Sequence, residues 1–491
     1  MLRRALRDIS TYSMASALGV LAGLISFPFL TRVLSNADYG LLAVISAGLT
    51  LGVGLAKLGQ QHAVVRFLPE AKDADGRAAV AASAIVGMCS SGLVALLLWL
   101  VIGLLLSARG GEDAPSPLLV AICGLLLWVR VMTSSAHNLL VAERQSLRVA
   151  VLGVISRYAH LGVMIVMLLY IRDDVSGFFE AALLVEAVML LVLLRSATRQ
   201  VPHQLRQFDP ALFKRMLVYG VPTMGAELCA VLISLGDRFM LAALAGLEVT
   251  SLYAANYNLA EYFSLVAVAA IWTGVVPAYM QAWEREGRER TEQLLSDLLA
   301  LVLIIGLPIV AGAALIGADV VRLLATERYV PGAAILPWVL AGMVLNGAMA
   351  MTAAGYLIQR RTRSLFLLNL AAAGLNLIGN LLLIPRFGLL GAAYATLISY
   401  VCMFVWASVA SRRLVHVRFD PRLLSAALAA TLFMGFAVDL VVPAQGLMRI
   451  VLALAIAPPL YALALLAFSR RSRVLLRAAP ALLRGRSAPA P

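Results

Sequence analysis

The chain has 491 residues, of which 62% are hydrophobic and only 13% are charged. A soluble domain usually carries about a quarter of charged residues, so this composition excludes a water-soluble protein and indicates a chain that lies in lipid. The 40 Lys and Arg exceed the 26 Asp and Glu, for a formal charge of +14. That excess suggests nucleic acid, but in a membrane protein the positions of the charges matter more than their sum.

Fourteen apolar segments follow one another along the chain, and each is long enough to cross about 30 Å of hydrocarbon as a helix. Backbone polar groups in lipid find partners only within helices or closed barrels, and the ten-residue alternation of barrel strands is not seen. We therefore predict an all-α polytopic membrane protein with about fourteen helices, and twelve stays open if the last pair is misread. The predicted spans are 11–34, 39–65, 79–107, 117–141, 149–171, 175–195, 212–244, 249–280, 294–317, 333–358, 364–384, 388–410, 423–442 and 447–468.

The connections between these segments differ in charge from one side of the membrane to the other. If the amino terminus is cytoplasmic, that side holds 28 of the 40 Lys and Arg, the outer side holds seven, and five lie in or at the edges of spans. Basic connections stay in the cytoplasm, so both termini are predicted there, and nucleic acid is not expected as a partner. The basic tail from Arg470 to Arg486 is predicted to be an amphipathic helix on anionic lipid, with a partner-binding site as the alternative.

Motifs for catalysis, ATP binding or metal binding are absent from the sequence. The three lysines, Lys57, Lys72 and Lys214, do not follow Gly as in a phosphate-binding loop, and no His precedes Glu as in zinc-protease helices. The four cysteines lie far apart in apolar stretches. Asp73 and Asp75 are spaced like the paired aspartates of sugar-nucleotide transferases but lie in a short turn with no domain around them. We expect no enzyme activity, no metal and no cofactor.

Two runs about 210 residues apart read alike, at 29–42 and 237–253. Each ends a span, makes a short turn with an acidic residue, and opens a new span in the same orientation. The pattern suggests a parallel repeat of two six-span lobes, which in transporters places the substrate path between the lobes.

Three motifs carry a family resemblance: Thr31-Arg-Val-Leu-Ser-Asn-Ala-Asp-Tyr-Gly-Leu-Leu, Asp237-Arg-Phe-Met-Leu followed by Ser251-Leu-Tyr-Ala-Ala-Asn-Tyr-Asn-Leu-Ala, and Ile384-Pro-Arg-Phe-Gly-Leu-Leu-Gly-Ala-Ala-Tyr. They resemble the polysaccharide-biosynthesis, Wzx-type oligosaccharide flippases, which share the MOP superfamily with MATE exporters and the lipid II flippase. The resemblance implies a MATE-like, V-shaped transporter with lobes at 1–200 and 201–420, two added helices over 421–469 and a cytoplasmic tail at 470–491.

The resemblance also implies a function. Such a protein moves an undecaprenyl-diphosphate-linked oligosaccharide across the bacterial inner membrane by alternating access, for O-antigen, capsule or exopolysaccharide synthesis. Its expected partners are the lipid-linked oligosaccharide, membrane lipids, and the polysaccharide polymerase with its chain-length machinery.

Two other functions are weighed against the flippase. The first is a MATE-like, cation-coupled exporter of small molecules, which needs an acidic interior, whereas the spans here contain Arg130 and Arg157. The second is a membrane enzyme such as a glycan polymerase or lipid-sugar transferase, which usually needs a sizeable outer loop. The connections here are too short for such a loop, so the flippase is preferred.

A lipid-linked diphosphate needs fixed cations in a wet cavity, and the planar fork of Arg suits phosphate oxygens. Ionisable groups within spans are costly and are therefore candidates for function. Structural alternatives are an ion pair of Arg130 with Glu186 and snorkelling of Lys57 and Arg66 to the interface. The predicted contacts to the diphosphate and sugars are Arg130, Arg157, Lys57, Arg66, His137, His160, Tyr257 and Asn256.

A second group of charged residues is predicted to act in gating or ion coupling. These residues lie near the outer ends of spans 1 and 7 and inside spans 6, 7 and 8; they are Arg32, Asp237, Arg238, Glu227, Glu261 and Glu186. Interface anchoring and interhelical hydrogen bonds are the structural alternatives. Four prolines are predicted to interrupt spans and permit bending, namely Pro28, Pro222, Pro308 and Pro337.

Overall fold

The computed structural model describes residues 2–110, 114–143, 145–200, 205–442, 446–469 and 471–474, and most of their side chains. This part of the chain is helical and contains no strand. Its α-helices are α1 (Leu2–Val33), α2 (Asn36–Ala56), α3 (Gln60–Glu70), α4 (Ala74–Ala108), α5 (Pro117–Ala142), α6 (Ser146–Tyr170), α7 (Val175–Gln200), α8 (Pro210–Ala245), α9 (Leu247–Arg285), α10 (Arg288–Leu324), α11 (Leu336–Thr352), α12 (Ala354–Ile358), α13 (Thr362–Phe387), α14 (Leu389–Ala410), α15 (Pro421–Val441) and α16 (Leu447–Phe468). The described residues also form two 3₁₀ segments, η1 (Leu205–Gln207) and η2 (Glu327–Ile335).

The all-α membrane architecture predicted from hydropathy is confirmed. Among the described residues, 13 helical segments are long and apolar enough to cross a membrane. The remaining predicted span, 249–280, falls within α9, which includes side chains outside the described set. Most of the basic tail, 475–491 together with residue 470, also lies outside the described residues, so its predicted amphipathic helix stays a prediction.

One face of α15 illustrates why lipid is the solvent of these helices. Leu432, Phe436 and Leu440 follow one another at four-residue spacing and are each more than 70% exposed. Residues four apart lie on the same side of a helix, so the three form one continuous apolar stripe. Such a stripe on a helix of a membrane chain faces hydrocarbon.

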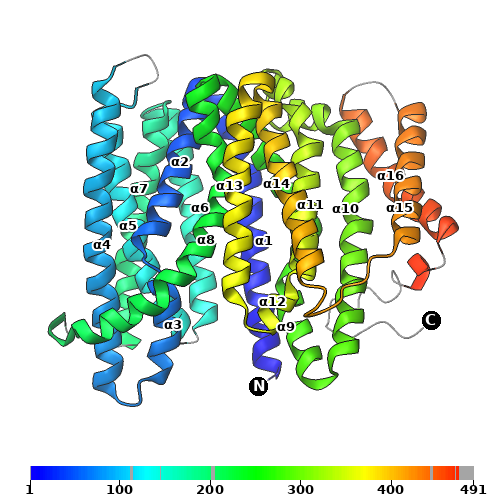
Figure 1. The fold of residues 1–491 in the computed structure, drawn as a ribbon. Coiled ribbons are helices and arrows are strands. Elements are labelled where there is room, and N and C mark those ends of the chain that lie inside the picture. Colours follow the sequence, from blue (N-terminus) through cyan, green and yellow to red (C-terminus); the bar gives the residue numbers. More distant parts are fainter. Residues whose placement is uncertain are drawn as a thin grey trace. The chain divides into compact units, whose positions relative to one another are not determined.

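The chain divides into two compact units, Met1–Ala242 and Ala243–Pro491. In the first unit, α5 packs against α4 and α7, as Figure 1 shows, and the core also takes in α3 and the start of α8. In the second unit, α10 packs against α11, α15 and α16. Most of α8 thus clusters with the first unit, whereas the sequence assigned the whole helix to the second lobe; the functional lobes at 1–200 and 201–420 stay a prediction.

The prolines differ in what they do to the helices. Pro28, Pro222 and Pro308 lie inside α1, α8 and α10, as predicted. The prediction for Pro337 is wrong: it lies in the first turn of α11, where its missing N–H has no intrahelical partner to lose.

Pro308 leaves the carbonyl of Ile304 without its usual helical donor, because a proline has no N–H to give to the residue four positions back. The hydroxyl of Tyr461 on α16 donates to this carbonyl at 2.7 Å, and the contact is buried. The interruption in α10 is therefore satisfied by a side chain from a helix 157 residues away in sequence. In Figure 1, α15 and α16 (orange and red) lie beside α10.

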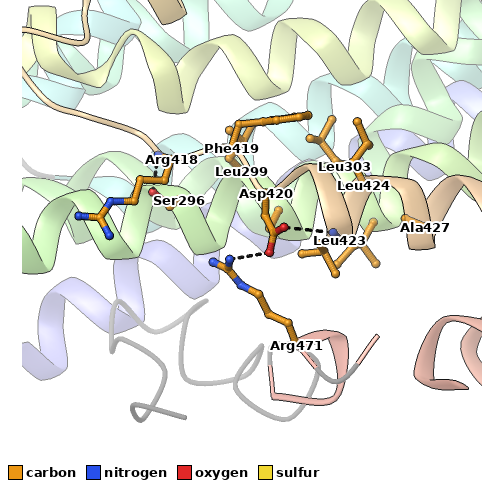
Figure 2. Close-up of a pocket in the computed structure, with 12 residues that line it drawn as sticks. Ser296, Leu299, Leu303, Arg418, Phe419, Asp420, Leu423, Leu424, Ala427 and Arg471 are labelled. Carbon is orange, nitrogen blue, oxygen red and sulfur yellow. Dashed lines mark hydrogen bonds and ion pairs between the residues drawn. The ribbon is translucent and has the colours of Figure 1, made fainter. Parts of the chain in front are cut away.

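A polar contact also joins α15 and α10 to the residues that follow α16. The guanidinium of Arg471 lies 2.6 Å from Asp420, which caps the amino terminus of α15 (Figure 2). It also lies 3.5 Å from Asp297 on α10. Burial raises the pKa of Asp420, but the guanidinium of Arg471 and two backbone N–H groups of α15 lower it by more. The pKa of this carboxyl therefore lies below its ordinary value.

This ion pair predicts a defined pH dependence of stability. The folded-state pKa of Asp420 is depressed, so its stabilisation is present above the unfolded-state pKa of about 4 and is lost as the pH falls below it. Arg471→Ala should cost roughly 1 kcal/mol at pH 7, because the pair is partly exposed, and the difference from wild type should shrink at pH 3.5. Arg473→Ala is the control, since Arg473 donates to the carbonyl of Leu466; thermal unfolding in detergent at both pH values measures the effect, and a pH-independent difference contradicts the assignment.

Candidate functional site

The predicted span 39–65 is interrupted at residues 57–59, between α2 and α3. Leu58 and Gly59 have positive φ angles of 50° and 69°, a conformation that only Gly adopts without strain. In an unbroken helix the N–H of Gln60 would bond to the carbonyl of Ala56. Here Gln60 N–H donates to the carbonyl of Lys57 at 2.9 Å, and the hydroxyl of Ser91 on α4 donates to Ala56 at 2.6 Å.

The interruption lies directly against α8. A Cβ at Gly59 would come within 1.9 Å of the carbonyl oxygen of Gly220, and one at Gly220 within 2.6 Å of the carbonyl of Gly59. The backbones of Gly59 and Gly220 are therefore in direct contact, and Gly220 lies two residues before Pro222 in α8. This contact fixes the level at which α8 runs past the end of α2.

A cavity of about 200 Å³ lies where α2, α5 and α8 meet, entirely within the first unit. Three of its lining groups are ionisable: Lys57, Arg130 and Glu227. The rest of its wall is largely apolar, with one hydroxyl. The full set of lining residues is Leu49, Thr50, Val53, Gly54, Lys57, Arg130, Met224, Glu227, Leu228 and Val231.

Arg130 lies on α5 and lines this cavity, and its guanidinium is hydrogen-bonded to Glu186 on α7. Its Nε donates to both carboxylate oxygens at 3.0 and 3.1 Å, and its Nη2 donates to Oε1 at 2.8 Å. Glu186 itself does not line the cavity. The structural ion pair considered from the sequence is thus present, and it holds the guanidinium of a residue that lines the cavity.

Glu227 is held by the first turn of α3. The side-chain amide of Gln61 donates to its Oε2 at 2.9 Å, and Nε2 of His62 lies 3.5 Å from the same oxygen. Lys57 lies near enough for its charge to interact with that of Glu227. The interruption after α2 therefore places a cation and two carboxylate-binding side chains around one acidic residue.

The two predicted histidines lie at the edge of this group. His137 on α5 interacts electrostatically with Lys57. His160 on α6 interacts with the Arg130–Glu186 pair, and its ring stacks edge-on against Phe178 at 5.2 Å. The structure thus brings both imidazoles near the cavity cations without placing either in the cavity wall.

Two predicted cations lie elsewhere in the first unit. Arg157 on α6 packs against α1, where a Cβ at Gly19 would come 2.5 Å from its Nη1. Arg66 on α3 lies 4.5 Å from the ring centre of Tyr219 and 3.6 Å from Glu70. Neither lines the cavity, so their predicted contacts to substrate stay predictions.

The remaining predicted residues are also apart from the cavity. Arg32 donates to the carbonyl of Pro28 within α1. Asp237 and Arg238 are buried near the end of α8, with 3.9 Å between Oδ1 and Nη1. Their gating role stays a prediction.

In the second unit, Asn256 is buried on α9 and donates to the carbonyls of Leu252 and Tyr329. Tyr257 is buried beside Tyr253, and Glu261 is exposed on the same helix. The hydrogen bonds of Asn256 suit a packing role. The predicted sugar contacts of Asn256 and Tyr257 and the ion coupling of Glu261 stay predictions.

Three participants are not among the predicted site residues: Gln61 and His62, which contact Glu227, and Ser91, which completes the interruption. The signal that could have found them is the Leu58-Gly59 step inside an apolar run, since Gly in a helix marks a weak point. Asp73 caps α4 by accepting from the N–H of Gly76, which accounts for the aspartate pair near the start of that helix without catalysis.

Comparison with known proteins gives a family. The model of the family described as "Polysaccharide biosynthesis protein" matches residues 5–283. A search of curated proteins finds no match.

Solved structures show the same fold. The lipid II flippase MurJ in an inward closed conformation superposes with a TM-score of 0.77 and 15% identity, over 94% of this chain and 99% of that chain. An inward-facing multidrug resistance MATE family transporter of the MOP superfamily superposes with a TM-score of 0.62 and 18% identity, over 83% of this chain and 95% of that chain. A MOP superfamily transporter from Pyrococcus furiosus superposes with a TM-score of 0.52 and 15% identity, over 83% of this chain and 96% of that chain. The chain is therefore a multi-pass membrane protein with this fold.

The glycine contact predicts a steric requirement. Gly59→Ala and Gly220→Ala should each lower the free energy of unfolding by more than about 1 kcal/mol, because the new Cβ would overlap backbone that cannot move independently. Gly153→Ala in α6 is the control, since its Cβ would meet nothing within 4 Å. Thermal unfolding of the purified variants measures this, and equal stability of all three would contradict the close approach.

The Arg130–Glu186 pair predicts a rescue. Glu186→Ala should cost roughly 1–3 kcal/mol, because it leaves a partly buried guanidinium without its partner. The charge-swapped double variant, Arg130→Glu with Glu186→Arg, should recover most of that stability. Glu180→Ala, which breaks the more exposed Arg172–Glu180 pair, should cost less. If the swap is no more stable than Glu186→Ala alone, the pair does not stabilise the first unit.

Proposed function

The chain belongs to the polysaccharide biosynthesis protein family, and from that membership we propose that it is a flippase for an undecaprenyl-diphosphate-linked oligosaccharide. It acts in the bacterial inner membrane, with both termini cytoplasmic, and supplies O-antigen, capsule or exopolysaccharide synthesis by alternating access. It transports and does not catalyse. The polysaccharide polymerase and its chain-length machinery are its expected partners.

One observation carries the substrate assignment: Lys57 and Arg130 line the same cavity. A diphosphate carries two or more negative charges and only acceptor oxygens, so it needs converging donors with positive charge. Lys57 supplies a compact ammonium and Arg130 a planar fork, and both suit phosphate. Because Glu186 occupies the Nε and Nη2 edge of Arg130, the Nη1 edge is the one assigned to the ligand.

The size and wall of the cavity agree with a partial site. At about 200 Å³ it is smaller than the roughly 300–1,000 Å³ that enclose a whole drug-sized ligand. We therefore assign it to the diphosphate and the sugar bonded to it, with the rest of the glycan and the polyprenyl chain outside. Apolar side chains such as Val53, Met224 and Val231 lower the local dielectric and strengthen the attraction of both cations for phosphate.

The assignment predicts which variants lose transport. Arg130→Ala and Lys57→Ala should each reduce translocation of a lipid-linked oligosaccharide in proteoliposomes by about tenfold to a hundredfold, the loss expected for one charge-assisted contact. Arg172→Ala is the matched control, because Arg172 also pairs with a glutamate of α7 but lies outside the cavity. The charge-swapped double variant separates binding from folding, since it should regain stability but not translocation.

Transport by the swapped protein at the wild-type rate would contradict this site. Extrusion of a cationic dye that is insensitive to Arg130→Ala would instead favour the MATE-like exporter.

A further inference from the structure

We propose that Glu227 is a specificity-determining residue that makes the cavity reject the sugar-free polyprenyl diphosphate and accept the glycosylated one. The inference rests on the proposed function, because it concerns the same cavity. It adds a discrimination that cations alone cannot supply, since Lys57 and Arg130 attract both lipids.

Glu227 is the one carboxylate among the described residues that line this cavity. Its carboxylate is 45% exposed and is anchored on one side, because the Gln61 amide donates to its Oε2 at 2.9 Å and Nε2 of His62 lies 3.5 Å from the same oxygen. Both anchors come from the first turn of α3, so the carboxylate cannot turn away from the cavity without losing them. None of the described hydrogen bonds uses Oε1, so that oxygen can accept a hydrogen bond from a ligand.

The charges of the two lipids differ in a way that this carboxylate senses. A sugar-free polyprenyl diphosphate ends in a phosphate whose second proton leaves near pH 6, so it carries close to three negative charges at pH 7. Once the terminal phosphate is esterified to a sugar, only two charges remain. A fixed negative charge in the wall of a small, largely apolar cavity therefore opposes the sugar-free lipid more strongly.

The hydrogen-bonding chemistry points the same way. A carboxylate only accepts hydrogen bonds, and so do the oxygens of an ionised diphosphate. The sugar-free lipid therefore offers Glu227 no donor and leaves the carboxylate facing a like charge. The first sugar offers hydroxyl and amide donors, and hydrogen bonds to a charged acceptor are among the stronger ones. Attraction for one ligand and repulsion of its competitor together produce specificity.

Other polar groups in the wall do not supply this discrimination. The hydroxyl of Thr50 donates to the carbonyl of Ser46 at 2.8 Å and is uncharged, so even where it accepts from a sugar it does not repel the sugar-free diphosphate. Lys57 and Arg130 carry only donors, so they bind the phosphate oxygens of either lipid. The distinction between the two ligands falls to Glu227.

The test measures binding of two probes to the purified full-length protein at pH 7: geranylgeranyl diphosphate, and the same lipid with one N-acetylglucosamine on its diphosphate. Glu227→Gln keeps the shape and removes the charge. This variant should bind the sugar-free probe about tenfold more tightly and bind the glycosylated probe more weakly. Glu227→Ala should tighten the first similarly and weaken the second by about tenfold. Gln61→Ala, which loosens the carboxylate without removing it, should reduce the selectivity by a smaller factor.

The decisive result is the opposite direction of the two changes. If Glu227→Gln shifts both affinities in the same direction, or shifts neither, the selectivity role is wrong. Arg130→Ala tests the underlying site separately, because it should weaken both probes. If it weakens neither, the proposed diphosphate site fails, whatever Glu227 does. Glu180→Gln, on the carboxylate that pairs with Arg172 outside the cavity, should leave both affinities unchanged.

Discussion

Hydrocarbon offers no hydrogen-bond partner, so any polar group released inside a membrane-embedded helix must find one within the chain. The protein meets this requirement in the same way at two distant places. Where α2 ends, the carbonyl of Ala56 accepts a hydrogen bond from the hydroxyl of Ser91. Where Pro308 interrupts the hydrogen bonding of α10, the carbonyl of Ile304 accepts a hydrogen bond from the hydroxyl of Tyr461. In both places a hydroxyl from a neighbouring helix donates to the carbonyl that has lost its helical partner, so no described hydrogen-bond acceptor is left unsatisfied there.

The first of these departures creates the candidate site. The turn at residues 57–59 ends α2 with Lys57 at the cavity and starts α3 with Gln61 against Glu227. The same turn lets the backbone of Gly59 touch Gly220, which brings α8 and its carboxylate alongside. Glu186, which does not line the cavity, holds the guanidinium of Arg130 through its Nε and Nη2. Two cations and one anchored carboxylate thus face a small space, an arrangement suited to a ligand that has both phosphate oxygens and hydroxyl donors.

Hydropathy predicted the spans well, because exposure to lipid imposes an apolar composition on each segment regardless of its neighbours. The pairing of Arg130 with Glu186 could be foreseen as an alternative, since buried opposite charges on nearby spans rarely stay apart. The interruption at Leu58 and Gly59 and the cavity that depends on it could not, because both require a contact between residues 59 and 220. Pro337 was misplaced for a similar reason: periodicity does not reveal where one apolar helix ends and the next begins.

We propose that Lys57 and Arg130 together hold the diphosphate of a lipid-linked sugar. A structure of the protein with a bound polyprenyl-diphosphate-linked sugar, determined in a lipid nanodisc, tests it most directly. We predict phosphate density within hydrogen-bonding distance of both the Lys57 ammonium and the Arg130 guanidinium, with the first sugar beside Glu227. Phosphate density bound elsewhere, with the Lys57–Arg130 cavity filled only by water, would contradict it.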